Sequence, residues 1–269
     1  FFEPQMGLKL QLRRSLELDL RQAMDRDEFE IYYQPQTRLP GGRIIGVEAL
    51  IRWLHPERGF VSPMEFIPVA EDVGLIEPIG AWLLKEACTE VANWPQQITL
   101  AVNLSAVQFT TGDLLKTVSH ALKESGLPPE QLEFEITESL LMKETGTTLE
   151  LLNKLREMNA SIAMDDFGTG YSSLSYIQHY PIDKIKIDRA FVMDLPENQE
   201  SLAIVNAISA MAESLGLKTT AEGIETKEQA RILSKAGCTF AQGYLFGKPM
   251  PAAEIIEMLG TKHRAKRSA

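Results

Sequence analysis

The spacing of apolar and polar residues predicts alternating strands and helices from residue 98 to the end of the chain. Short apolar runs have the length of buried strands, and segments with helical periodicity separate them. Strands are expected at 98–102, 132–136, 161–166, 182–187, 217–221 and 239–241. Helices are expected near 112–125, 139–159, 172–180, 199–215, 226–236 and 251–260. This alternation is typical of a parallel sheet flanked by helices.

The segment before residue 98 has a different pattern. Residues 29–39 are rich in aromatic and β-branched side chains, and Pro40-Gly41-Gly42 leads into a second apolar run at 43–54. So short a link predicts an antiparallel hairpin, followed by helices near 63–73 and 77–94. With the hairpin there are eight strands in about 250 residues, which favours a closed (β/α)8 barrel over an open sheet. An ordinary barrel of this type has a helix between its first two strands, so a modified one is expected.

The first residues predict a separate helix. Leu8, Leu12, Leu16, Leu20 and Met24 are spaced four apart among charged residues, as on an amphipathic helix over 6–27. This helix either packs on the barrel or connects it to an upstream domain. We therefore divide the chain into a connector helix at 1–27, a barrel at 28–260 and a basic, solvated tail at 261–269. Because the chain begins without Met, it is expected to be a piece of a longer protein.

Composition limits the classes of function. The 269 residues carry a net charge of −10, which disfavours a reader of duplex DNA. Neither a membrane-spanning apolar run nor a secretory leader is present, so the segment is expected to be cytoplasmic and without direct membrane insertion, either by itself or as the cytoplasmic part of a larger membrane-anchored protein. Cys88 and Cys238 lie far apart in sequence and outside any CxxC or Cys/His cluster, which disfavours zinc and a disulfide framework. An acidic protein can still bind a phosphate ester through divalent cations.

Oxygen-bearing side chains recur at the ends of the predicted strands, where parallel barrels carry their chemistry. They are Glu48, Asn103, Glu135, Asp165, Asp166, Asp188, Glu222, Glu225 and Gln242, with Lys186 among them. Any one of them alone is more often a cap or a surface group. A buried acid without a partner costs on the order of several kcal/mol, however, so the recurrence of such residues at successive strand ends indicates a shared site.

The donor set has no His or Cys and therefore favours Mg²⁺ or Mn²⁺. Adjacent aspartates at 165 and 166 need cations, a shared proton or open water. More carboxylates than one ion requires suggest two ions, bridged by Asp165, which suits in-line attack at phosphorus. A glycosidase is the competing interpretation, but it requires one isolated acid and one base.

Nine short motifs, in this order, resemble the EAL family of cyclic di-GMP phosphodiesterases, and the resemblance covers about 29–260. The motifs are Tyr33-Gln34-Pro35, Glu48-Ala49-Leu50, Ile51-Arg52-Trp53, Val102-Asn103-Leu104-Ser105, Glu135-Ile136-Thr137-Glu138-Ser139, Asp165-Asp166-Phe167-Gly168-Thr169-Gly170, Lys186-Ile187-Asp188, Glu222-Gly223-Ile224-Glu225 and Gln242-Gly243-Tyr244. The resemblance implies an α/β fold, a TIM-like barrel with an antiparallel first strand. It also implies metal-dependent hydrolysis of cyclic di-GMP to linear 5′-pGpG, which would lower second-messenger signalling in biofilm and motility control.

The resemblance assigns roles to individual residues. A first ion would be held by Glu48, Asn103, Glu135 and Asp165, and a second by Asp165, Asp166 and Glu222. Glu48, Lys186 and Glu222 would be catalytic, with Lys186 at the attacking water. Substrate contacts would come from Gln34, Leu50, Arg52, Asp188, Glu225 and Gln242. Arg52 also falls on the same side of its strand as Glu48, which suits a guanidinium that binds phosphate, although a surface ion pair is the alternative.

A loop after the fifth strand would gate the site and form a homodimer interface. It comprises Phe167, Gly168, Thr169, Gly170, Tyr171 and Ser172, with Glu138 as its anchor. A rigid turn without a regulatory role is the alternative. Calcium is expected to occupy the metal site and inhibit turnover, because it demands less exact geometry.

Three functions are compatible with these motifs. The first is a competent phosphodiesterase, and the second is a receptor that binds the same dinucleotide through a degenerate site. A receptor would be expected to carry a substitution at Glu48, Asp166 or Glu222, and none is present. The third is a module that transmits dimerisation to or from an attached domain, such as an upstream GGDEF domain.

Overall fold

The computed structural model describes residues 4–111, 113–142, 146–168, 177 and 179–265. Eight strands form a closed barrel, in the spatial order β1-β9-β8-β7-β6-β5-β4-β2, and pairing between β1 and β2 closes it. The strands are β1 (Phe29–Arg38), β2 (Arg43–His55), β4 (Thr99–Leu104), β5 (Leu132–Thr137), β6 (Ser161–Phe167), β7 (Lys184–Ile187), β8 (Lys218–Ala221) and β9 (Phe240–Gln242). The predicted modified (β/α)8 barrel is confirmed.

Strand β1 runs against both of its neighbours. It pairs antiparallel with β2 from Phe29 opposite Trp53 to Arg38 opposite Arg43, and antiparallel with β9. Every other neighbouring pair around the barrel is parallel. The predicted hairpin with an antiparallel first strand is therefore confirmed. Gly41 and Gly42 both have positive φ in the connecting turn, which explains why the sequence uses glycine there.

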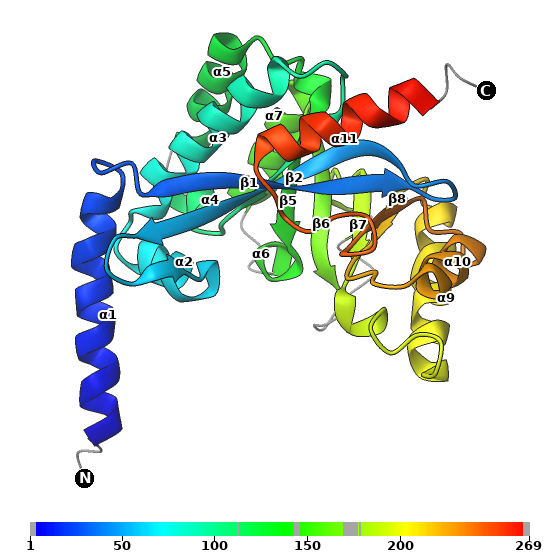
Figure 1. The fold of residues 1–269 in the computed structure, drawn as a ribbon, viewed down its shortest axis with the longest axis horizontal. Helices are drawn as coiled ribbons and strands as arrows, with labels where there is room; N and C mark the ends of the chain where they lie inside the picture. The colour runs from blue at the N-terminus through cyan, green and yellow to red at the C-terminus, as the bar shows by residue number, and fades with distance from the viewer. Residues whose placement is uncertain (1–3, 112, 143–145, 169–176, 178, 266–269) are drawn as a thin grey trace.

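Helices surround the barrel, as Figure 1 shows. They are α1 (Pro4–Ala23), α2 (Pro63–Asp72), α3 (Ile76–Ala92), α4 (Gln108–Thr111), α5 (Leu114–Ser125), α6 (Glu138–Met142), α7 (Gly146–Glu157), α9 (Gln199–Ser214), α10 (Lys227–Lys235) and α11 (Ala252–Ala265), with 3-10 turns η1 (Pro129–Gln131) and η2 (Arg189–Phe191). The long helix expected at 139–159 is described as two, α6 and α7, on either side of residues 143–145. Most of the helix expected at 172–180 falls outside the described residues. A short strand, β3 (Gly59–Val61), was not predicted, because three residues carry no readable periodicity.

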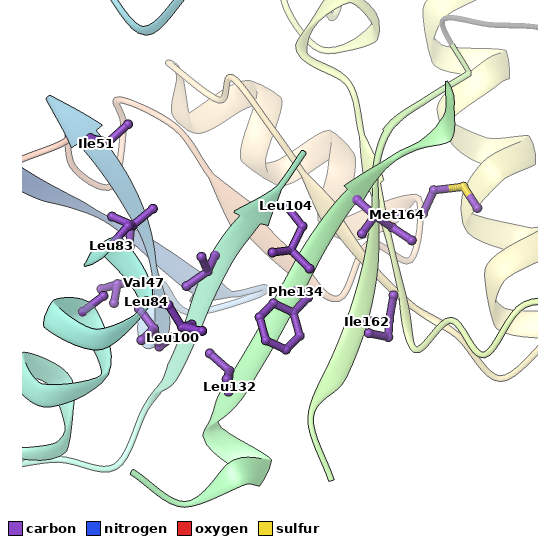
Figure 2. Packing of buried hydrophobic residues seen from close by; sticks show 14 of the residues in the cluster. Val47, Ile51, Leu83, Leu84, Leu100, Leu104, Leu132, Phe134, Ile162 and Met164 are labelled. Atoms are coloured by element: carbon purple, nitrogen blue, oxygen red, sulfur yellow. The ribbon is translucent and has the colours of Figure 1, made fainter. Parts of the chain in front are cut away.

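Alternation along the parallel strands separates an apolar exterior from a polar interior. On β5, Leu132, Phe134 and Ile136 alternate with Glu133 and Glu135. Figure 2 shows Leu84 of α3 beside Leu100 of β4, so the outer residues pack against the helices. The intervening residues face the barrel interior, where the acids and lysines meet.

The C-terminal half of helix α1 packs on the barrel. Leu16, Leu20 and Ala23 are buried, which agrees with the predicted amphipathic pattern. The N-terminal half projects away from the barrel in Figure 1. Among the described helices, none combines the length and apolar character that crossing a bilayer requires. The division of the chain at residues 27 and 260 stays a prediction.

Two layers of lysine and glutamate fill the barrel interior. In the lower layer, Lys184 Nζ of β7 donates to Glu133 Oε1 of β5 at 2.6 Å, and both side chains are about 5% exposed or less. The ammonium also lies 5.1 Å from the ring centre of Phe240. The upper layer, two residues further along the same strands, pairs Lys186 with Glu135. The two layers are thus separate ion pairs stacked along the same strands.

Replacing Lys184 by methionine is expected to destabilise the fold by about 3–5 kcal/mol, because Glu133 would be left as an unpaired buried carboxylate. The urea midpoint at unchanged m value measures this loss. The double variant Lys184→Met/Glu133→Leu removes both charges at similar volume and should recover most of the stability. A double variant as unstable as the single one would contradict this explanation.

Candidate functional site

The upper layer opens at the carboxyl ends of the parallel strands. Lys186 Nζ lies 2.6 Å from Glu135 Oε2, 2.7 Å from Glu222 Oε1 and 3.1 Å from Asp165 Oδ1. These groups come from β7, β5, β6 and the segment after β8, and the Lys186 side chain is 1% exposed. Residues separated by up to 87 positions in the sequence, Glu135 to Glu222, therefore surround a single ammonium group.

Glu48 is held from two sides next to this cluster. Asn103 Nδ2 donates to Glu48 Oε1 at 2.7 Å, and Gln242 Nε2 donates to Glu48 Oε2. Gln242 Nε2 also donates to Gln34 Oε1 at 3.0 Å. Strands β1, β2, β4 and β9 thus bring four predicted site residues together. Both Glu48 oxygens are fixed as acceptors, so its carboxylate has one orientation.

The cluster shifts the protonation of its members. Burial alone would lower the pKa of Lys186, but Glu135, Glu222 and the other acids hold that pKa well above its ordinary value. Burial would raise the pKa of Glu48, but Lys186 and the hydrogen bonds from Gln242 and Asn103 lower it. For Glu135, burial and the neighbouring Glu48 outweigh Lys186 and raise the pKa well above the ordinary range.

The pKa of Glu222 is also raised. Burial raises its pKa to about 8, although Lys186 opposes the shift. Three carboxylates contact the single Lys186 ammonium, so an additional cation would favour the ionised form of these acids.

The donor chemistry fits a hard divalent cation. The atoms at the opening are carboxylate and amide oxygens, which Mg²⁺, Mn²⁺ and Ca²⁺ prefer. Glu135, Asp165 and Glu222 converge on the Lys186 ammonium, and within the described residues no group of three His, Cys, Asp or Glu side chains has the arrangement of a ready metal site. The residue types fit the predicted metal site, and the ligand assignments stay predictions.

Asp166 and Asp188 lie at the rim. Asp166 is exposed and is the next-to-last residue of β6. Its φ is 56°, an uncommon backbone conformation for a residue other than glycine. Burial, Asp165 and Asp188 together raise the pKa of Asp166 to about 6. Asp188 Oδ1 also accepts from the backbone N–H of Ala190 at 2.7 Å, so it caps the η2 turn.

Two adjoining cavities share Leu50 as a wall. The first, of about 290 Å³, is lined by Glu48, Asp165, Lys186 and Glu222 together with Gln34, Glu225 and Gln242. The second, of about 340 Å³, is mostly apolar and is lined by Leu50, Arg52 and Asn103 together with side chains of α2 and α3. A ligand with two lobes could span Leu50 and reach both cavities.

The predicted loop is only partly described. Glu138 is buried at the start of α6, Phe167 is buried at the end of β6, and Gly168 has a φ of 94°. A side chain at Gly168 would press against the Phe191 ring, 3.0 Å from the added atom. Thr169, Gly170, Tyr171 and Ser172 lie outside the described residues. The gating and dimer roles of this loop therefore stay predictions.

The sequence analysis missed four residues at this site. Gln36 Nε2 donates to Glu135 Oε1 at 3.2 Å, and its position two residues after Gln34 on one strand could have indicated it. Arg189, Tyr244 and Pro249 line the first cavity. These three follow strand ends in sequence, where loop geometry rather than periodicity decides where they point.

Gly243 shows why the chain is tightly constrained beside Gln242. It has a φ of 155°, and an added Cβ would lie 2.2 Å from backbone atoms of Ile224. The backbone after β9 thus contacts the backbone after β8 directly. This contact keeps Gln242 and Glu222 on the same side of the opening.

Known proteins resemble this chain over nearly its full length. It is 44% identical over 260 residues to the bifunctional diguanylate cyclase/cyclic di-GMP phosphodiesterase MucR of Pseudomonas aeruginosa, covering 95% of this chain and 38% of MucR. It is 41% identical over 263 residues to the cyclic di-GMP phosphodiesterase NbdA of the same organism, covering 96% of this chain and 34% of NbdA. The chain therefore spans little more than a third of the length of these curated relatives.

Solved structures share the fold. The MucR phosphodiesterase in complex with cyclic di-GMP matches with a TM-score of 0.86 and 44% identity, covering 90% of this chain and 99% of that one. The FimX EAL domain of Pseudomonas aeruginosa bound to cyclic di-GMP matches with a TM-score of 0.81 and 29% identity, covering 87% and 96%. The EAL domain family matches residues 17–249. With its barrel, its strand-end acids and these relatives in agreement, the chain belongs to the EAL domain family.

Proposed function

We propose that this chain hydrolyses cyclic di-GMP to linear 5′-pGpG. The observation that carries the proposal is the convergence of Glu48, Glu135, Asp165, Glu222 and Lys186 at one opening of the barrel. The relatives MucR and NbdA, named as cyclic di-GMP phosphodiesterases, support the substrate class.

The acids are proposed to hold two ions, Mg²⁺ or Mn²⁺. Glu48, Asn103, Glu135 and Asp165 would hold the first, and Asp165, Asp166 and Glu222 the second. Such ions polarise phosphoryl oxygens and lower the pKa of a bound water.

Lys186 is proposed to contact the attacking water and to offset negative charge that develops at phosphorus. Its burial supports this role, because an ammonium group excluded from solvent acts strongly on nearby charge. Its contacts with three carboxylates fix its position before substrate arrives, so little reorganisation is needed.

Substrate is proposed to span Leu50, with polar contacts from Gln34, Gln242 and Glu225 in the first cavity. Arg52 lines the second cavity and is proposed to bind a phosphate. Asp188, at the rim beside Asp166, is proposed to support the site rather than to contact the reacting atoms.

Two features of the larger protein are also proposed. Helix α1 is proposed to connect the barrel to a preceding domain, such as a GGDEF domain, which suits the greater length of the relatives. The loop after β6 is proposed to gate the site and to form a homodimer interface.

Product analysis tests the proposed function. The purified chain is incubated with cyclic di-GMP and Mg²⁺, with and without chelator, and the nucleotide products are separated and identified. Linear pGpG that forms only without chelator is the expected result. Tight binding of intact cyclic di-GMP without any product would instead identify a receptor.

Replacing Mg²⁺ by Ca²⁺ is expected to leave cyclic di-GMP binding in place while turnover falls close to the background rate, because Ca²⁺ is larger and tolerates irregular coordination. Calorimetry measures binding, and product formation measures turnover under the same conditions. Full activity in Ca²⁺ would contradict the two-ion assignment.

A further inference from the structure

Strand β2 extends beyond the barrel. Its parallel pairing with β4 ends at Ala49, while its antiparallel pairing with β1 continues to Trp53. There β3 adds to its other edge, with Leu54 opposite Phe60. The three strands form a flap at the opening, and Arg52 stands on this flap four residues past Glu48.

The two faces of the flap differ. One face packs Phe29, Trp53 and Phe66 together, with ring centres 5.5–5.9 Å apart, and Trp53 and Phe66 are fully buried. The opposite face carries Arg52 and the Phe60 ring, which is 56% exposed. A rigid aromatic layer thus supports the face that carries Arg52.

Arg52 is held between two aromatic rings. Its guanidinium carbon lies 5.5 Å from the ring centre of Tyr32 on β1 and 5.9 Å from that of Phe60 on β3, both within cation–π range. Its Nη1 donates to the backbone oxygen of Ile51 at 2.9 Å. The Arg52 side chain is partly buried and forms no ion pair with another described residue, so the alternative of a surface ion pair is not supported there.

The tip of the flap is fastened to α1. Arg58 donates to Asp19 Oδ2 from Nε at 3.1 Å and from Nη2 at 2.8 Å, and to Ser15 Oγ at 2.7 Å. His55 Nδ1 accepts from the backbone N–H groups of Glu57 and Arg58, which fixes the turn between β2 and β3. Helix α1 is therefore linked to the turn before β3 through Arg58 and Asp19, whose side chains are only partly exposed.

We propose that Phe60 is a positioning residue that holds Arg52 for a phosphate of the substrate, and that Asp19 of α1 keeps the flap in place. The inference rests on the proposed function and extends it, because it assigns a role in substrate affinity to β3 and to α1. Phe60 acts through Arg52 and does not touch the reacting atoms. An arginine held before binding loses less side-chain entropy on contact with phosphate, which favours affinity.

A double-mutant cycle tests this role. Phe60→Ala is expected to raise KM for cyclic di-GMP about two- to tenfold with kcat unchanged, as loss of a cation–π contact predicts. Phe60→Tyr retains a ring and should keep KM near that of the wild type. In an Arg52→Ala background, Phe60→Ala should have no further effect. Met64→Ala, at a position 89% exposed on the neighbouring α2, is the control.

The same cycle can overturn the proposal. An equal effect of Phe60→Ala with and without Arg52 would mean that the ring contacts substrate directly. Asp19→Ala should raise KM in the wild type but not in the Phe60→Ala background, and an unchanged KM in the wild type would overturn the link to α1.

A measurement without ligand separates this inference from the proposed function. The Nε–Hε signal of Arg52 in a ¹⁵N correlation spectrum is assigned by its loss in Arg52→Lys. Phe60→Leu, which removes the ring but retains an apolar side chain, should shift this signal, whereas Met64→Ala should not. An unmoved signal overturns the positioning role even if hydrolysis occurs. A shifted signal in a protein that yields no product leaves the contact established and counts only against the proposed function.

Discussion

Lys186→Met is expected to lower kcat by about 10²- to 10³-fold while KM changes little, because it removes a buried positive charge that acts on the transition state. Methionine matches the length and apolar stem of lysine, so the barrel interior stays filled. The ammonium lies within 3.1 Å of Glu135, Asp165 and Glu222, and no other described Lys or Arg contacts these three acids. Steady-state kinetics with cyclic di-GMP measures the split between kcat and KM.

Stability must be measured beside activity in this variant. The three acids lose their counterion, and breaking a buried pair costs about 3–5 kcal/mol. Mg²⁺ is expected to raise the Tm of Lys186→Met more than that of the wild type, because cations can replace the lost charge. Lys184→Met is the matched control, since it removes the other interior lysine of β7 while the upper layer stays intact. Normal kcat with raised KM in Lys186→Met would count against a transition-state role.

The sequence predicted the barrel and most of the site because both depend on local periodicity. Glu135 and Lys186 alternate with buried apolar residues on short strands, so a period of two places them on the interior face. Parallel pairing then brings strand ends to one opening. The unusual hairpin followed from two strand-like runs at 29–39 and 43–54, and its antiparallel direction followed from the short Pro-Gly-Gly link between them.

Side-chain contacts across the barrel could not be predicted from the sequence. Glu133 and Lys184 lie on β5 and β7, with β6 between them, and no spacing along the chain indicates their contact. The flap contacts of Arg52 likewise depend on a three-residue strand. Such partners arise from the closure of the sheet, which local patterns do not encode.

Glu48→Ala is expected to abolish hydrolysis of cyclic di-GMP in both Mg²⁺ and Mn²⁺, with a fall in kcat of about 10³-fold or more. As a proposed ligand of the first ion, Glu48 supplies a charged oxygen that neither neighbour replaces, because Asn103 and Gln242 turn neutral N–H donors toward its position. A metal acting as a Lewis acid supplies several kcal/mol, roughly what such a loss requires. Glu48→Gln tests charge separately from size, and it should lose turnover to a similar extent.

Binding should survive the loss of turnover in these variants. Leu50 and Arg52 line the second cavity, whereas the Glu48 carboxylate accepts from Asn103 and Gln242, so calorimetry should find cyclic di-GMP affinity within about tenfold of the wild type. Glu65→Gln, at an exposed acid on α2, is the control for a change of charge alone. Turnover retained by Glu48→Ala in Mn²⁺ would remove Glu48 from the metal site. The acids that surround Lys186 would then have to hold the ions without it.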